Sequence, residues 1–275
     1  AARAEAIRRY DALHFLFEAP AAGPPWRFPA RSVVRVGDAY GPSRCPLAPC
    51  WRNSTTRPGW VWKADTSSDE LTGHTFFYPL LNRHGELNAS EAASVRSVVD
   101  GLVGGLVMHN LSLIDPGTGK HTSWGNFGPH WLNDVRSWSD DRGLRALEIL
   151  SYLAAAEEVT GDDAYRKEAE RLRRDHGYHR MLVNAKITDP CDDNHSDDEE
   201  AFLPLYTYIM AYKALGRPRE PEFDAALARF CRIVTPERPS LYLAVCAVGN
   251  ATPGAGDAAA AALVENLRGW PLELI

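Results

Sequence analysis

The sequence predicts an all-α protein built from helical hairpins. Apolar residues recur at helical spacing through most of the 275-residue chain, and short turns rich in glycine and proline separate these segments. Two segments begin with the pattern Ser-x-x-Glu, which caps the start of a helix. Short connections favour antiparallel neighbours. We therefore expect a single helical-hairpin domain over residues 1–275.

The predicted helices follow one another with one long interruption. After a helix at 3–18, residues 19–62 form an irregular segment rich in proline and tryptophan, with a strand-like run at 32–36. Four tryptophans in that segment argue against disorder. A turn is predicted at 115–119, a polar aromatic loop at 121–131, and helix or strand at 241–248. Further helices are predicted at 67–83, 88–110, 142–159, 163–175, 178–186, 196–215, 221–233 and 257–268.

The two capped segments have similar sequences. Ser67 and Glu70 are spaced as a capping box, and so are Ser196 and Glu199. In both segments acids stand at the helix start, where the helix dipole favours negative charge, and an aromatic body follows. The similarity predicts an internal repeat whose two acidic starts face a shared concavity. Because capping boxes are generic, coincidence is the alternative.

Carboxylates and histidines lie together at the starts of the two capped helices that the sequence predicts. Glu70 and His74 are four residues apart and share a helical face, and a carboxylate beside a histidine suits acid–base chemistry. The alternative is a solvated acidic cap with a histidine packed behind it. The candidate catalytic residues are Asp69, Glu70, His74, His195, Asp198 and Glu199. No cofactor is predicted, although Asp192 and Asp193 offer the oxygen ligands that Ca²⁺ prefers.

An aromatic group supplies the candidate substrate-binding residues. Tryptophan rings offer a large face on which sugars stack, and core packing is the alternative role. These residues are Trp124, His130, Trp131 and Tyr178.

Five Asn-x-Ser/Thr sequons favour an extracellular, secreted glycoprotein over a cytosolic protein with coincidental sequons. They lie at Asn53, Asn88, Asn110, Asn194 and Asn250. Asn110 is the least certain, because it ends an apolar helix. Cys45 and Cys50 are spaced to close a small disulfide, and two of Cys191, Cys231 and Cys246 are expected to form another.

The charge and hydropathy patterns limit the partners. The net charge of −6 and the lack of a basic block argue against nucleic acid, and no apolar run approaches the length of a membrane span. No signal peptide is recognisable at the first residue. The sequence leaves self-association open.

Four segments resemble those of the α/α-toroid enzymes, the six-hairpin glycosidases and related polysaccharide lyases: KADTSSDELTGH, HTSWGNFGPHWLN, RGLRALEILSYLAAAEEVTGDDAYRKEA and NHSDDEEAFLPLYTY. In those proteins helix starts and their loops line a carbohydrate cleft. The resemblance, over residues 60–215, implies a toroid or part of one, and a secreted hydrolase- or lyase-like protein acting on an extracellular polysaccharide. The alternative is a non-catalytic extracellular glycoprotein, either carbohydrate-binding or a filament subunit.

Overall fold

The computed structural model describes residues 2–20, 27–38, 51–185, 195–252 and 254–269. The chain divides into two compact units, one of Ala1–Gly128 with Val159–Asp163 and the other of Pro129–Glu158 with Ala164–Ile275. We call them unit 1 and unit 2. Helices dominate and strands are few, so the chain is mostly helical, as predicted. The toroidal arrangement of its hairpins stays a prediction.

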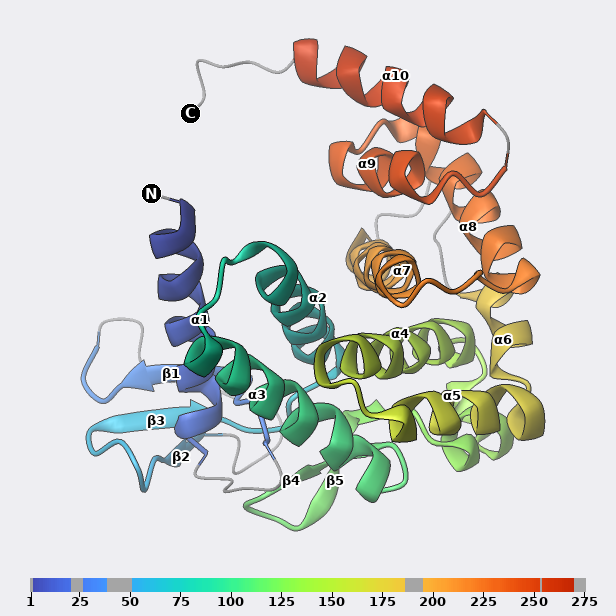
Figure 1. Ribbon diagram of the computed structural model, residues 1–275. Coiled ribbons are helices and arrows are strands. Elements are labelled where there is room, and N and C mark those ends of the chain that lie inside the picture. Colours follow the sequence, from blue (N-terminus) through green and yellow to red (C-terminus); the bar gives the residue numbers. More distant parts are fainter. Residues whose placement is uncertain (1, 21–26, 39–50, 186–194, 253, 270–275) are drawn as a thin grey trace. The chain divides into compact units, whose positions relative to one another are not determined.

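In its described residues, unit 1 combines three helices with two small antiparallel sheets (Figure 1). The helices are α1 (Ala2–Glu18), α2 (Ser68–His84) and α3 (Ala89–Met108). One sheet has the order β1-β3-β2 and the other is the hairpin β4-β5. The strands are β1 (Ser32–Arg35), β2 (Trp51–Asn53), β3 (Trp60–Lys63), β4 (Ser112–Asp115) and β5 (Lys120–Asn126).

The prediction of a loop over 121–131 was wrong in its first part, because β5 runs to Asn126 and pairs with β4. The sequence of β5, KHTSWGN, is mostly polar and its buried residues do not alternate, so no strand pattern shows in it. The turn between β4 and β5 was predicted correctly. Oδ1 of Asp115 accepts from the N–H of Gly117 at 2.8 Å and from that of Thr118 at 3.2 Å, which closes the turn.

The core of unit 1 lies between α2 and α3. Val95, Val98, Leu102 and Leu106 recur at helical spacing on α3, and each is almost fully buried. Asn88 caps this helix, because its Oδ1 accepts from the N–H groups of Ser90 and Glu91 at 3.0 Å. The buried face of α2 is formed by Leu71, Tyr78 and Leu81.

The described residues of unit 2 form helices joined by turns and short connections, with no strand among them. Its longer helices are α4 (Arg142–Thr160, whose last two residues belong to unit 1), α5 (Asp163–His176), α7 (His195–Ala214), α8 (Pro221–Val234), α9 (Ser240–Gly249) and α10 (Ala255–Arg268). Shorter turns are His130–Asp134, Arg136–Trp138, α6 (Tyr178–Met181) and Leu182–Asn184.

Helix α4 is the central element of unit 2 and lies between α5 and α7 (Figure 1). It is buried along most of its length, including Leu144, Leu147 and Leu150. Gly143 sits so close to the backbone of residues 184–185 that a Cβ there would lie 2.4 Å from the amide nitrogen of Ala185. Only glycine fits at this approach.

A disulfide joins α8 to α9 through Cys231 and Cys246. This confirms that two of the three later cysteines pair, while Cys45, Cys50 and Cys191 lie outside the described residues. The apolar stretch 241–248, which fitted helix or strand, is helical.

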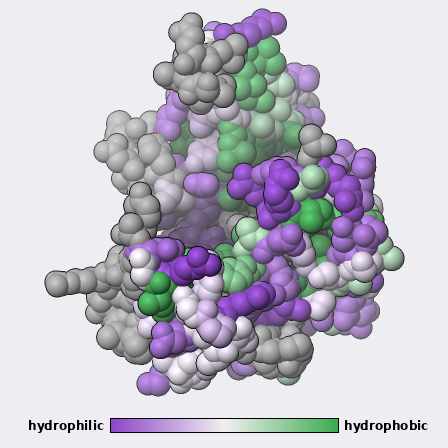
Figure 2. Space-filling view, turned by 90° about the vertical axis from the view of Figure 1, so that its left-hand side faces the viewer, coloured by the Kyte–Doolittle hydropathy of each residue, from purple (hydrophilic) through white to green (hydrophobic). Residues whose placement is uncertain are grey.

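The last two helices leave apolar side chains at the surface. In the view of Figure 2, hydrophobic residues gather toward the top, at the height at which Figure 1 draws α9 and α10. Leu241 and Val248 of α9 and Val264 and Leu267 of α10 are each more than two fifths exposed. None of the helices in the described residues combines the length and apolar character that crossing a membrane would require.

Candidate functional site

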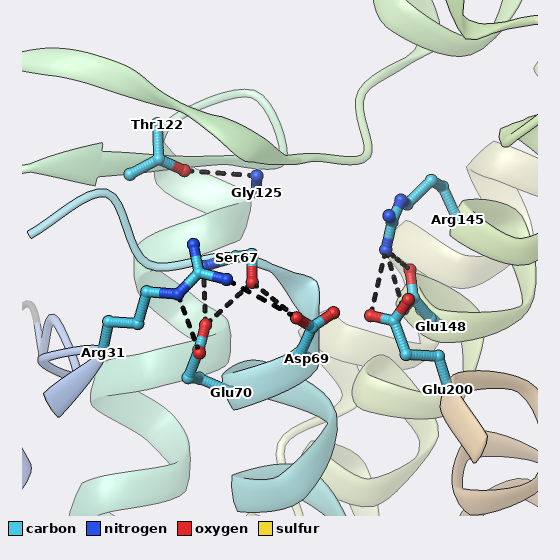
Figure 3. Close-up of polar contacts among 9 residues, drawn as sticks. All are labelled: Arg31, Ser67, Asp69, Glu70, Thr122, Gly125, Arg145, Glu148 and Glu200. Carbon is cyan, nitrogen blue, oxygen red and sulfur yellow. Dashed lines mark hydrogen bonds and ion pairs between the residues drawn. The ribbon is translucent and has the colours of Figure 1, made fainter. Parts of the chain in front are cut away.

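Two carboxylates, a serine and an arginine meet at the start of α2 (Figure 3). The N–H of Ser67 donates to Oε2 of Glu70 at 2.8 Å, which is part of the predicted capping box. The Ser67 hydroxyl lies 2.8 Å from the same oxygen and 3.1 Å from Oδ2 of Asp69. The guanidinium of Arg31 lies 3.3 Å from Glu70 and 3.8 Å from Asp69. One hydroxyl and one guanidinium therefore hold both carboxylates side by side.

The carboxylate of Asp69 is the more open of the two. Its side chain is 55% exposed, whereas that of Glu70 is 20% exposed. Both oxygens of Glu70 are engaged, one by Ser67 and the other by Arg31. The capping role therefore accounts for Glu70, and Asp69 is the carboxylate that a ligand can reach.

Strand β5 runs beside this start. The N–H of Ser123 donates to Oδ1 of Asp65 at 2.7 Å. Asp65 lies two residues before Ser67, the N-cap of α2. Asp65 has a φ of +57°, which is uncommon for a residue with a side chain, and such conformations cluster at functional sites. Arg31 donates to the Asp65 carbonyl at 3.3 Å. The loop through Asp65 thus ties β5 to the polar start of α2.

Trp124 follows Ser123 on β5 and is 50% exposed. The strand is fixed on either side of it, because the N–H of Gly125 donates to the Thr122 hydroxyl at 3.2 Å (Figure 3). A Cβ on Gly125 would lie 2.7 Å from that hydroxyl, so the strand has no room for a side chain at this position. A rigid strand therefore presents the indole at the surface.

His74 is buried in unit 1 and does not take part in the polar start. It is 2% exposed, and its ring stacks on that of Tyr78 at 5.6 Å and contacts Phe17 at 4.7 Å. Burial lowers the pKa of His74 to about 3. No residue that the structure describes forms a hydrogen bond with its Nδ1. The ring is a neutral core residue, the alternative that the sequence left open.

The other aromatic candidates belong to unit 2. Trp131 packs against the buried Trp138 with ring centroids 5.4 Å apart, and His130 is exposed, 3.5 Å from Asp134. Tyr178 is fully buried, and burial raises its pKa. Tyr178 therefore has no surface on which a sugar could stack.

The start of α7 differs from the predicted cap. The helix begins at His195, so Ser196 lies inside it and not at the N-cap. Asp198 is 2% exposed, whereas Glu199 is exposed. The side chain of His195, and also Asp192, Asp193 and Asn194, lie outside what the structure describes. The shared concavity with the start of α2 stays a prediction.

Glu200, the next residue, makes the buried contact that the sequence did not predict. Nη1 of Arg145 lies 3.5 Å from Glu200 and 2.9 Å from Glu148 (Figure 3). All three side chains are at least nine tenths buried. Burial alone would lower the pKa of Arg145, but the two carboxylates raise it. Two buried acids thus share one arginine beside α7.

Unit 2 also contains a cavity of about 660 Å³ between α4, α5, α7 and the α7–α8 connection. Arg173 of α5 donates through Nη2 to the hydroxyls of Tyr208 at 2.9 Å and Tyr212 at 2.7 Å. Both hydroxyls donate to Glu220, which also lies 3.0 Å from Nε of Arg173. The four-residue spacing of the tyrosines indicates a shared face. The arginine they meet is 35 residues away in the chain, which the sequence could not reveal.

The sequence matches no protein-family model, and comparisons with curated proteins and with solved structures found no significant match. Among the described residues, no cluster of three or more histidine, cysteine or acidic side chains has the geometry of a metal site. The residues themselves therefore carry the functional argument.

Proposed function

We propose that the protein is carbohydrate-active and binds a glycan on unit 1, at the surface formed by β5 and the start of α2. The observation that carries the proposal is the half-exposed indole of Trp124 on a strand tied to that start through Ser123 and Asp65. An aromatic face packs against the apolar face of a sugar ring. Asp69 and Arg31 supply an acceptor and a donor for sugar hydroxyls.

Binding of wild-type protein to a panel of polysaccharides tests this proposal. Trp124→Ala should weaken binding at least tenfold, because the stacking face is removed from an exposed position. Met108→Ala is the matched control, since Met108 is an exposed apolar residue of the same unit, 65% exposed at the end of α3. The proposal fails if no polysaccharide binds, or if the two variants bind alike.

Hydrolase- or lyase-like turnover is the second candidate, favoured by the exposed carboxylate of Asp69 at the start of α2. Glycosidases use Asp or Glu carboxyl groups as acid, base or nucleophile at the scissile bond. Assays for reducing ends and for unsaturated products would detect the two chemistries. Asp69→Asn should abolish turnover. The variant should still bind the polysaccharide, because Trp124 is unchanged in it. Unchanged turnover in that variant would exclude this carboxylate as a catalytic group.

We also propose that the chain is a secreted glycoprotein. Asn53, Asn88, Asn110 and Asn250 are all exposed, which supports glycosylation even at Asn110. The Cys231–Cys246 disulfide fits an oxidising compartment. Protein from a eukaryotic secretory host should lose mass on treatment with an N-glycosidase, and an unchanged mass would contradict the proposal.

A further inference from the structure

The cavity of unit 2 has the size and polarity of a small-molecule site. Its volume of about 660 Å³ falls within the range of about 300–1,000 Å³ typical of ligand pockets. Apolar side chains of Leu153, Ala154, Ala169 and Pro218 line part of it. Besides Tyr165 and Tyr212, three arginines and three glutamates line the rest: Arg166, Arg173, Arg217, Glu157, Glu170 and Glu220.

The charged residues of the cavity are held in place by one another. Arg217 binds Glu157 through two contacts of 2.6 and 2.5 Å, and Arg166 lies 3.0 Å from Glu170. Arg173 is fixed by Tyr208, Tyr212 and Glu220, as described above. Tyr212 is itself held neutral, because burial raises its pKa to about 12. The wall is therefore preorganised, and a ligand would not have to order it.

Some hydrogen-bonding capacity in this wall remains unused. Nη1 of Arg173 has no hydrogen-bond partner within the described residues, nor does Nε of Arg217. Glu170 uses one oxygen for Arg166, which leaves the other as an acceptor. The ionised side chains of the lining sum to zero net charge, so the wall as a whole favours neither an anion nor a cation. A hydroxyl group matches such a wall, because it donates and accepts at once.

We propose that this cavity binds a neutral sugar of one or two rings, with Arg173 as the anchoring donor and Glu170 as an acceptor. The inference takes its ligand class from the proposed function and adds a second site in unit 2. The ring hydroxyls meet the arginine–glutamate wall, and the apolar face of the ring lies on Ala154 and Ala169.

Saturation-transfer NMR on the full chain tests the site with glucose, galactose, mannose and cellobiose, and with glucuronate and glucosamine as charged comparators. Ala169→Leu should weaken sugar binding at least tenfold, because the larger side chain fills open space in the cavity. Ala225→Leu is the control, since Ala225 is exposed on α8 and does not line the cavity. Arg173→Lys should also weaken binding, because lysine keeps the charge but cannot bind the tyrosines and the sugar together.

The outcomes separate this site from the one on unit 1. Neutral-sugar binding that is lost in Ala169→Leu and kept in both Ala225→Leu and Trp124→Ala supports the inference. Binding lost only in Trp124→Ala would overturn it while leaving the proposed function intact. Absence of binding by the neutral sugars, or a preference for either charged comparator, would also overturn it.

Discussion

The starts of α2 and α7 have nearly the same sequence and use it differently. In α2, Ser67 is the N-cap and Glu70 closes the capping box with its carboxylate near the surface. In α7 the helix begins before Ser196, and the acid with a buried role is Glu200, held by Arg145. The pattern Ser-x-x-Glu therefore identifies a helix start but not which acid is exposed. The two starts differ because different arginines hold their acids. Arg31 binds Glu70 at α2, Arg145 binds Glu200 at α7, and each arginine comes from a distant segment.

The largest expected effect is the loss of the buried arginine. Arg145→Gln should destabilise the protein by about 3–5 kcal/mol, because Glu148 and Glu200 remain buried without that guanidinium. Arg31→Gln at the α2 start should cost about 1 kcal/mol or less, since its side chain is 31% exposed. Urea unfolding of both variants measures the difference. Equal losses of stability in the two variants would contradict the expected difference between the buried and the partly exposed arginine.

The triple variant Arg145→Met, Glu148→Leu, Glu200→Leu sharpens this comparison. Replacing a buried ionic group by apolar residues of similar volume is often neutral or stabilising. The triple variant should therefore be more stable than Arg145→Gln alone. A triple variant as unstable as Arg145→Gln would show that packing, and not burial of charge, sets the cost.

The next effect concerns His74, which lies seven residues after the N-cap Ser67, about two turns into α2, and has no counterpart in α7. Its pKa of about 3 in the folded state is below the unfolded value of about 6.5. The unfolded chain therefore takes up the proton first, and stability falls as the pH drops from 6.5 toward 3. Between pH 6.5 and 4.5 this loss is about 2 kcal/mol.

His74→Phe should lack that part of the pH dependence while preserving the stacking on Tyr78. Urea unfolding at pH 6.5 and 4.5 gives the difference between the two proteins. Parallel pH profiles for wild type and variant would contradict the buried, neutral state of His74.

The smallest effect is that of the two serines. Ser67→Ala should destabilise by about 1 kcal/mol, because the cap of α2 loses its hydroxyl. Ser196→Ala should cost about 0.5 kcal/mol or less, because Ser196 is an exposed residue inside α7. Thermal unfolding of the two variants measures both losses of stability. A larger loss for Ser196→Ala would support the predicted capping role of Ser196.

The sequence was sufficient for the helices and for the local contacts of the site. Apolar spacing placed α3 and α4 to within two residues, and the capping box at Ser67 is a contact over three residues. The contacts of Arg31 with Glu70 and of Arg173 with Tyr208 join segments more than thirty residues apart, so no spacing rule could find them. The burial of His74 and Tyr178 depends in the same way on distant packing partners.

The Cys231–Cys246 disulfide gives the last two helices a redox-dependent attachment. Helix α10 packs on α9, and α9 is covalently joined to α8. In a chain whose cysteines are reduced, this pair of helices loses its covalent tie to α8 and is held by non-covalent contacts, such as the hydrogen bond from Arg219 to the carbonyl of Gly249. Partial proteolysis of reduced protein should therefore begin at the C-terminal end of unit 2, and oxidised protein should resist it. The sensitivity of the C-terminus to protease would then report the compartment in which a given molecule folded.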